Sequence, residues 1–215
     1  MNVVISGTGS GIGKAIAEKF LREGHTVYGY DIAASAIRHE AYHHLIHDIR
    51  RGGFASVPEP DILINNAGTL EEKDAIEVNL QGTMRFTEHF LNGDSLRSIL
   101  FIASASARNG AEFPNYVASK AGVVAYMKNL ALSEAKRGIT CNSISPGGVI
   151  TPANRHILES ERLYAAVKAE TLLQKWAEPE EIADLAWYLT VVNRSITGED
   201  ILIDNGEMLK SNFIW

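Results

Sequence analysis

The sequence predicts an α/β fold in which a doubly wound parallel sheet of about seven strands is covered by helices on both faces. Two observations predict it. Short apolar runs, several rich in Val and Ile, alternate along the chain with longer segments whose apolar residues recur at helical spacing. The chain of 215 residues is also long enough for one well-filled core and short for two. We therefore expect a single domain over residues 1–215.

The expected strands are apolar runs bounded by Gly, Asp or Asn, at residues 3–6, 26–30, 43–47, 62–65, 98–103, 139–144 and 201–203. The expected helices lie between them, at residues 13–23, 72–91, 115–136 and 179–191. The segment 152–175 is helical in pattern but follows a strand end, where ligands bind in such sheets. We expect it to form a substrate lid.

Composition and charge narrow the class of protein. Apolar residues make up 46% of the chain and charged residues 21%, which are ordinary globular values. The net charge of −6 argues against a nucleic-acid partner held by bulk electrostatics. Cys141 is the only cysteine, so no internal disulfide forms and a reducing compartment fits. The sequence has no basic leader before an apolar run and no apolar stretch of membrane-spanning length, so we expect a cytoplasmic protein without a membrane partner.

A glycine-rich turn joins the first expected strand to the first expected helix. Gly7, Gly11 and Gly13 fit the spacing G-x-x-x-G-x-G, and no triplet of glycines here fits G-x-G-x-x-G. Glycines let backbone N–H groups approach a pyrophosphate, and the helix N-terminus adds a partial positive charge. The turn predicts a dinucleotide site; the alternative is a glycine-rich connection that binds nothing.

Asp31 strengthens the dinucleotide interpretation. It ends the second expected strand, about 20 residues after the glycines, where a carboxylate accepts hydrogen bonds from an adenosine ribose. The alternative is an aspartate that caps the following segment.

Tyr116 and Lys120 are four residues apart, so on a helix they share a face. A free tyrosine has a pKa near 10, and a nearby ammonium lowers it by stabilising the phenolate. The pair therefore predicts a proton donor and acceptor usable near neutral pH. Taken alone, the same spacing also describes an ordinary solvated helix face.

These residues stand in an order that resembles the short-chain dehydrogenase/reductase family over nearly the whole chain. The matching elements are Ser6-Gly7 with Gly11-Ile12-Gly13, Asn65-Asn66-Ala67-Gly68, Val78-Asn79-Leu80, Ser104, Tyr116 with Lys120, Pro146-Gly147 with Thr151, and Asp204-Asn205-Gly206. The resemblance implies a Rossmann fold, a nicotinamide cofactor and an oxidoreductase.

The resemblance also implies catalytic roles. Tyr116 would be the general acid/base, and Lys120 would lower its pKa and hold the nicotinamide ribose. Ser104 would bond the reacting oxygen of the substrate. Asn79 would hold a water in a proton relay to Lys120, although it could instead brace a bent helix.

Further residues are implied at the cofactor. Asp48 would meet the adenine amine, Asn66 and Gly68 would line the adenosine side, and Val149 and Thr151 would meet the carboxamide. In full, the expected cofactor-binding residues are Gly7, Gly11, Ile12, Gly13, Asp31, Asp48, Asn66, Ala67, Gly68, Tyr116, Lys120, Pro146, Gly147, Val149 and Thr151.

The sequence departs from the family pattern at several places. Ser6 stands where the family usually has Thr, which keeps the hydroxyl. The interval from Ser104 to Tyr116 is about one residue short, so Ser106 is a second candidate for the catalytic serine. The segments 48–61 and 68–79 are short as well, and the second predicts a more open site. This short segment, together with Asp31-Ile32, gives a hint of the 3α-hydroxysteroid dehydrogenase/carbonyl reductase branch.

We therefore expect an NAD-dependent enzyme that interconverts a small-molecule alcohol and its carbonyl. Two alternatives stay open. A 3-oxoacyl thioester reductase would use NADPH, which Asp31 disfavours, and a non-catalytic dinucleotide sensor would not need Tyr116 and Lys120. No metal is expected, since the histidines at 39, 43, 44 and 47 fall on or beside one strand without a completing ligand. The helices at 72–91 and 115–136 resemble those that pair across a two-fold axis in the family, so we expect a homodimer or homotetramer.

Overall fold

Seven parallel strands form one sheet in the computed structural model, which describes residues 1–210. The order is β3-β2-β1-β4-β5-β6-β7. The strands are β1 (Asn2–Ser6), β2 (Thr26–Asp31), β3 (Tyr42–Ile46), β4 (Ile62–Asn65), β5 (Ser98–Ile102), β6 (Thr140–Pro146) and β7 (Asp200–Ile203). The predicted doubly wound parallel sheet is thus confirmed. The strand order reverses between β1 and β4, which is where such sheets bind ligands, beyond the carboxyl ends of the strands.

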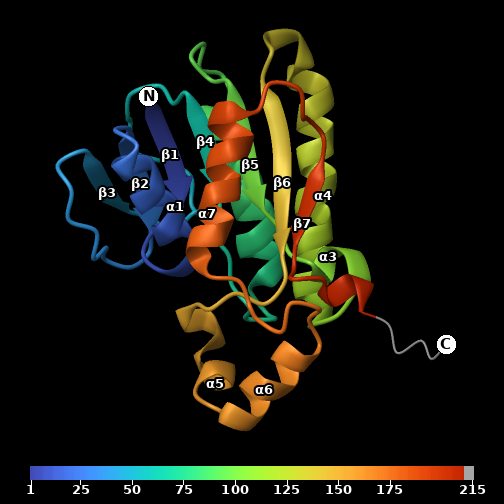
Figure 1. Cartoon of the computed structure of the whole chain (residues 1–215). Coiled ribbons are helices and arrows are strands. Elements are labelled where there is room, and N and C mark those ends of the chain that lie inside the picture. Colours follow the sequence, from blue (N-terminus) through green and yellow to red (C-terminus); the bar gives the residue numbers. More distant parts are fainter. Residues whose placement is uncertain (211–215) are drawn as a thin grey trace.

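Helices cover both faces of the sheet. On one face α1 (Gly11–Arg22) and α7 (Pro179–Trp187) pack against each other, and α7 crosses in front of the strands in Figure 1. On the other face α2 (Thr83–Phe90) and α4 (Pro114–Glu134) bury side chains such as Phe86 and Met127. Strand residues alternate between the two cores, as expected for a sheet buried on both sides.

The helix expected at 72–91 begins later than predicted. Residues before it form a loop, and the first helical residues are a π-helical stretch, η1 (Ile76–Gly82), which continues into α2. The cause is local. The side chain of Asn79 bonds the backbone of Thr69 through both its oxygen and its nitrogen, which folds the chain back before the helix starts.

The connections on either side of β3 contain no helix. Residues 32–41 and 47–61, all within the described part of the chain, are loops and turns. Aromatic side chains cover this part of the sheet instead: Phe54 packs edge-on against Tyr30 and Phe86, with ring centroids 6.1 and 5.2 Å apart. In the short segment at 48–61, a loop that carries Phe54 therefore covers the core where a helix does not.

Short helices fill the remaining connections: α3 (Ser106–Asn109), η2 (Ala135–Arg137), η3 (Pro152–Asn154), α5 (Arg155–Leu158), α6 (Glu161–Ala169), η4 (Tyr188–Val192) and η5 (Glu207–Leu209). Figure 1 shows α5 and α6 projecting beyond the carboxyl ends of the strands. None of the residues in these two helices is buried. These two helices of the predicted lid segment at 152–175 thus stand apart from the core, whereas Thr171 in the same segment is buried. Closing of the segment over a substrate stays a prediction.

Within residues 1–210, no helix is both long and apolar enough to cross a membrane. The cytoplasmic location stays a prediction.

Candidate active site

The glycine turn brings the end of β1 to the N-terminus of α1. Gly7 has a φ of 78°, in the left-handed region that favours glycine. At Gly13, a Cβ atom would overlap the carbonyl oxygen of Gly7. Both glycines are therefore required for the chain to turn this tightly, and the turn leaves backbone N–H groups near the partial positive charge of α1.

Asp31 ends β2 beside this turn. Its Oδ2 accepts a 2.8 Å hydrogen bond from the Gly9 amide, and its Oδ1 accepts a 2.9 Å bond from the Ala33 amide. Two backbone donors thus fix the carboxylate between the glycine turn and the loop after β2. This is the place expected for a ribose-binding carboxylate.

Ser6 and Asn66 join the ends of β1 and β4. The Ser6 hydroxyl oxygen accepts hydrogen bonds of 3.1 Å from the amides of Asn66 and Ala67. The Asn66 side-chain amide donates to the carbonyl oxygens of Ser6 and Gly7, at 3.2 and 2.9 Å. The resemblance predicted that Asn66 lines the adenosine side of the cofactor. In the structure, the Asn66 side chain binds the backbone of the glycine turn and so stabilises it.

Asp48 lies in the loop after β3 and is paired with a neighbour. Arg50 donates to its Oδ2 from Nε at 2.9 Å and from Nη2 at 2.7 Å. This guanidinium is the main cause that lowers the pKa of Asp48. Contact between Asp48 and an adenine amine stays a prediction, and it would have to share the carboxylate with Arg50.

Lys120 lies buried on α4, one turn after Tyr116. Its Nζ donates a 2.9 Å hydrogen bond to the Ile102 carbonyl oxygen and lies 5.9 Å from the centre of the Tyr116 ring. Among the described residues, no carboxylate forms an ion pair with it. Because burial disfavours the ammonium form, the pKa of Lys120 falls to about 8.

The pKa of Tyr116 shifts opposite to the sequence-based expectation. Burial raises it above its ordinary value, and the neighbouring Ser104 hydroxyl opposes the shift by favouring the phenolate. The Lys120 amine bonds the Ile102 carbonyl oxygen, and the lowering of the Tyr116 pKa by Lys120 stays a prediction. Ser104 is thus the group that favours the phenolate of Tyr116.

Ser104, and not Ser106, is the serine beside the tyrosine. Ser104 follows β5 and is half-buried, and its hydroxyl accepts a 3.2 Å hydrogen bond from the Ser106 amide. Ser106 begins α3 with its side chain buried.

Asn79 sits in the π-helical stretch and is almost fully buried. Its Oδ1 accepts a 2.7 Å bond from the Thr69 amide, and its Nδ2 donates to the Thr69 carbonyl and to Ser119 Oγ, both at 3.0 Å. These contacts join the loop after β4 to α4 at the residue before Lys120. The proposed water relay stays a prediction, and bracing the bent helix is the role that these contacts support.

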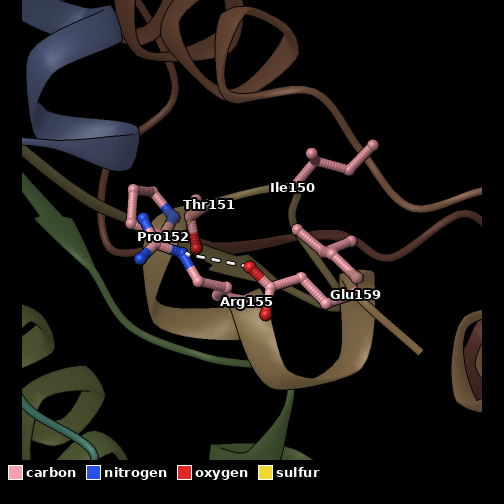
Figure 2. A pocket seen from close by; sticks show the side chains of 6 residues that line it. Ile150, Thr151, Pro152, Arg155 and Glu159 are labelled. Atoms are coloured by element: carbon pink, nitrogen blue, oxygen red, sulfur yellow. Dashed lines mark ion pairs between the residues drawn. The ribbon is translucent and has the colours of Figure 1, made fainter.

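Thr151, one of the two residues expected near the carboxamide, lines a pocket of about 350 Å³. It is lined by Ile150, Thr151, Pro152, Arg155, Leu158 and Glu159, and Figure 2 shows the Arg155–Glu159 ion pair across it. Gly11 faces Thr151, since a Cβ atom there would lie 3.3 Å from Thr151 Cγ2. Thr151 is thus the residue of the pocket that lies next to the glycine turn.

Pro146 and Gly147 lead into this region from β6. The Gly147 amide donates a 3.0 Å hydrogen bond to the Ile203 carbonyl, and a Cβ atom at Gly147 would lie 2.8 Å from the Asp204 side chain. Val149 is buried. These residues position Thr151, and their contact with a cofactor stays a prediction.

Two contacts of this site have no signal in the sequence. Glu72 Oε1 accepts a 2.9 Å hydrogen bond from the Asn115 amide at the start of α4. Arg108 on α3 donates a 2.7 Å bond to Asp200 Oδ2 on β7. The first contact anchors the start of α4, the helix that carries Tyr116. The second anchors α3, the helix that follows Ser104. The short loop at 68–79 could have drawn attention to Glu72, but spacing alone does not say where its side chain goes.

The residues present fit a nicotinamide dinucleotide. The glycine turn offers backbone donors at a helix N-terminus, Asp31 offers acceptors beside it, and the ammonium form of Lys120 has more donors than its one bond to Ile102 uses.

Comparison with known proteins gives the family. A family model described as enoyl-(acyl carrier protein) reductase matches residues 51–207. Acetoacetyl-CoA reductase of Paracoccus denitrificans is 31% identical, over 94% of this chain and 96% of that protein. The chain belongs to the short-chain dehydrogenase/reductase family. It is an oxidoreductase of this family.

Other members of the family are similar over their whole length. The 3-oxoacyl-[acyl-carrier-protein] reductase FabG of Vibrio cholerae is 28% identical, over 94% of this chain and 95% of that one. Among solved structures, aldohexose dehydrogenase of Thermoplasma acidophilum is 25% identical with a TM-score of 0.88, covering 100% of this chain and 96% of its own. A 4-hydroxyisoleucine dehydrogenase complexed with NADH is 25% identical with a TM-score of 0.85, covering 98% and 99% of the two chains.

Proposed function

We propose that this short-chain dehydrogenase/reductase interconverts a secondary alcohol and its ketone with NAD(H), using Tyr116 as the general acid/base. The observation that carries the proposal is the meeting of Ser104, Tyr116 and Lys120 where β5 ends beside α4. The bound nicotinamide would supply or accept the hydride.

The protein's own residues would handle the proton. In reduction, the Tyr116 hydroxyl donates its proton to the carbonyl oxygen, and in oxidation the phenolate takes it back. With substrate bound, the one hydroxyl proton of Ser104 would turn from the Tyr116 oxygen to the substrate oxygen and thereby stabilise charge that develops there. Lys120, held by Ile102, keeps two donors for the ribose hydroxyls and the neighbouring phenol.

Asp31 favours NAD(H) over NADP(H). Its carboxylate has lone pairs left after the two backbone bonds and can accept from ribose hydroxyls. The similarity to a 4-hydroxyisoleucine dehydrogenase that binds NADH agrees with this choice.

The curated relatives favour a second candidate, the reduction of 3-oxoacyl thioesters with NADPH. FabG of Vibrio cholerae and acetoacetyl-CoA reductase both act on such substrates by name, and the matching family model is named for an acyl carrier protein as well. For the substrate class, therefore, sequence similarity favours the thioester. For the cofactor, the Asp31 carboxylate favours NAD(H).

A turnover screen tests the proposal. Secondary alcohols, aldohexoses, steroids and 3-oxoacyl thioesters are each assayed with both cofactors, in wild type and in Tyr116→Phe. We expect turnover with NAD(H), and a loss of about 10²–10⁴-fold in Tyr116→Phe with NADH affinity nearly unchanged. A Tyr116→Phe enzyme with near-normal kcat removes Tyr116 from the mechanism. Turnover confined to thioesters and NADPH would establish the second candidate instead.

A further inference from the structure

Tyr42 on the edge strand β3 reaches the glycine turn. Its hydroxyl lies 2.8 Å from Thr8 Oγ1, and Thr8 is fully buried within the turn. The same hydroxyl lies 3.0 Å from Nδ1 of His44, two residues further along the strand. The Tyr42 hydroxyl thus joins the glycine turn to His44, a residue that has no part in the proposed catalysis.

His44 continues the chain of hydrogen bonds to the loop after β2. Its Nε2 lies 2.8 Å from the Ala33 carbonyl oxygen. The Ala33 amide in turn donates to Asp31 Oδ1, and Asp31 Oδ2 accepts from Gly9, the neighbour of Thr8. The contacts therefore close a ring through Thr8, Tyr42, His44, Ala33, Asp31 and Gly9.

With a neutral His44, the hydrogen bonds of the ring run in one direction. A carbonyl oxygen only accepts, so His44 Nε2 carries the proton that it donates to Ala33. In the neutral imidazole Nδ1 then accepts from the Tyr42 hydroxyl, whose oxygen accepts from Thr8. Every polar atom of the three side chains in this arrangement has a partner, so the ring holds the two loops in one relative position.

Gly29 on β2 makes room for the ring. A Cβ atom there would overlap Thr8 Oγ1 and would lie 2.6 Å from the Tyr42 hydroxyl oxygen. A side chain at this position would separate Tyr42 from Thr8. The glycine in the middle of a buried strand is thus explained by the ring.

We propose that Tyr42 and His44 are positioning residues for the adenosine end of the dinucleotide. They hold the glycine turn and the Asp31 loop at the separation that the pyrophosphate and ribose require, so they set cofactor affinity and leave proton transfer unaffected. This inference rests on the dinucleotide binding proposed above. Neither residue needs to touch the cofactor, because the ring acts through Asp31 and the turn.

His43 offers a matched control. It lies between the two residues on the opposite face of β3, where its ring stacks on Tyr28 with centroids 4.9 Å apart. His43→Ala therefore disturbs the same edge strand without touching the ring.

The experiment compares Tyr42→Phe, His44→Ala and His43→Ala with wild type. NADH affinity is measured by fluorescence titration, kcat and KM by steady-state kinetics, and hydrogen exchange at residues 8–10 and 31–34 in the cofactor-free protein. We expect Tyr42→Phe and His44→Ala to weaken NADH binding about fivefold or more, since each removes the part-buried hydrogen bond between Tyr42 and His44 and opens the ring. Their kcat at saturating NADH should stay within about twofold of wild type, and both loops should exchange faster. His43→Ala should keep wild-type affinity.

Unchanged NADH affinity in both ring variants overturns the inference, as does an equal loss in His43→Ala, which would indicate a merely structural strand. A lower melting temperature without a change in affinity contradicts the inference as well. A wild type that binds no dinucleotide overturns the proposed function itself and this inference with it. A wild type that binds and turns over NADH normally, with ring variants that do the same, removes only the ring's role.

Discussion

The amine of Lys120 donates its hydrogen bond to the Ile102 carbonyl oxygen, 2.9 Å away at the end of β5. This contact ties the catalytic helix α4 to the strand that leads to Ser104. It also places a titrating group in the core, because burial lowers the pKa of Lys120 to about 8.

The first prediction concerns stability and pH. In the unfolded chain Lys120 loses its proton near its ordinary pKa of 10.5, and in the folded protein near 8. Between these values the unfolded state binds more protons, so stability rises with pH. The unfolding free energy of wild type relative to Lys120→Met should therefore be constant below about pH 8 and then rise, by on the order of 2–3 kcal/mol by pH 10.5. Denaturant titrations from pH 7 to 10.5 measure it, and a difference that stays flat across this range contradicts the buried, shifted amine.

The second prediction concerns Ser104. Because its hydroxyl opposes the burial that raises the pKa of Tyr116, Ser104→Ala should raise that pKa further. Oxidation needs the phenolate, so the pH at half-maximal kcat should move up, and kcat should fall about 10²-fold or more. Ser104→Thr, which keeps the hydroxyl, should recover part of both effects.

Ser106→Ala is the matched control, since Ser106 is buried at the start of α3 and lies two residues away. It should keep the wild-type pH profile. A loss of activity in Ser106→Ala that equals the loss in Ser104→Ala would reverse the assignment of the catalytic serine.

Local pattern was enough for the sheet but not for the loops around it. All seven strands match their predicted runs closely, and the signal is clearest for β4 and β5, because a strand buried on both faces leaves a continuous apolar signature. The late start of the helix before Asn79 was missed, because the hydrogen bonds between Asn79 and Thr69 that end the loop are not encoded in periodicity.

In the site, too, the positions of residues on their elements could be predicted from the sequence, whereas their contacts could not. Motif order located Tyr116, Lys120 and Asp31 on the expected elements, because each sits at a strand end or on one helix face. The rise in the pKa of Tyr116 had no signal in the sequence, because the burial that causes it depends on the folded core. The ring through Tyr42 and His44 was missed too, since the sequence offered only histidines on an edge strand.

The third prediction concerns the lid. Helices α5 and α6 contain no buried residue, and α5 lines one side of the pocket beside Thr151. Segments with so few buried contacts open at low free-energy cost, and lids of this kind commonly limit turnover. Amides of residues 152–169 should exchange fast in the free protein and become protected with NADH and substrate bound. Strong and equal protection in both states would show a rigid segment.

The fourth prediction concerns assembly. Ala118, Ala125 and Leu132 are exposed at seven-residue intervals along α4, and Leu132 is 81% exposed. Gly122, by contrast, faces Leu80 of its own chain, so its small size serves internal packing. A homodimer or homotetramer paired through α4 would cover the exposed side chains. Light scattering at micromolar concentration should give a multiple of the 23.5 kDa chain mass, and Ala125→Glu should lower it. A monomer mass for wild type refutes the pairing.

The last prediction concerns the cofactor. The Asp31 carboxylate, fixed by Gly9 and Ala33, would accept from an unphosphorylated ribose but would face a 2′-phosphate as a close like charge. Ile32, the next residue, is 72% exposed and supplies no cation.

Nearby basic side chains have partners of their own. Lys14 lies 3.6 Å from Glu18, Arg38 donates to the Ser35 carbonyl of its own loop, and Arg50 is paired with Asp48. None of these contacts directs a cation toward Asp31. The like-charge contact with a 2′-phosphate is therefore left without compensation from these three residues.

Wild type should prefer NAD over NADP by at least about tenfold in kcat/KM, because a charge-assisted hydrogen bond contributes roughly 1.5–3 kcal/mol. The double change Asp31→Ala with Ile32→Arg should reverse the preference, since it removes the repulsion and places a guanidinium where the side chain is exposed. Asp31→Ala alone should only reduce the preference, which separates loss of ribose binding from gain of phosphate binding. Comparing kcat/KM for both cofactors in the three proteins decides it. A wild type that uses NADP equally well would contradict the role of Asp31 and favour the 3-oxoacyl thioester reductase that the curated relatives suggest.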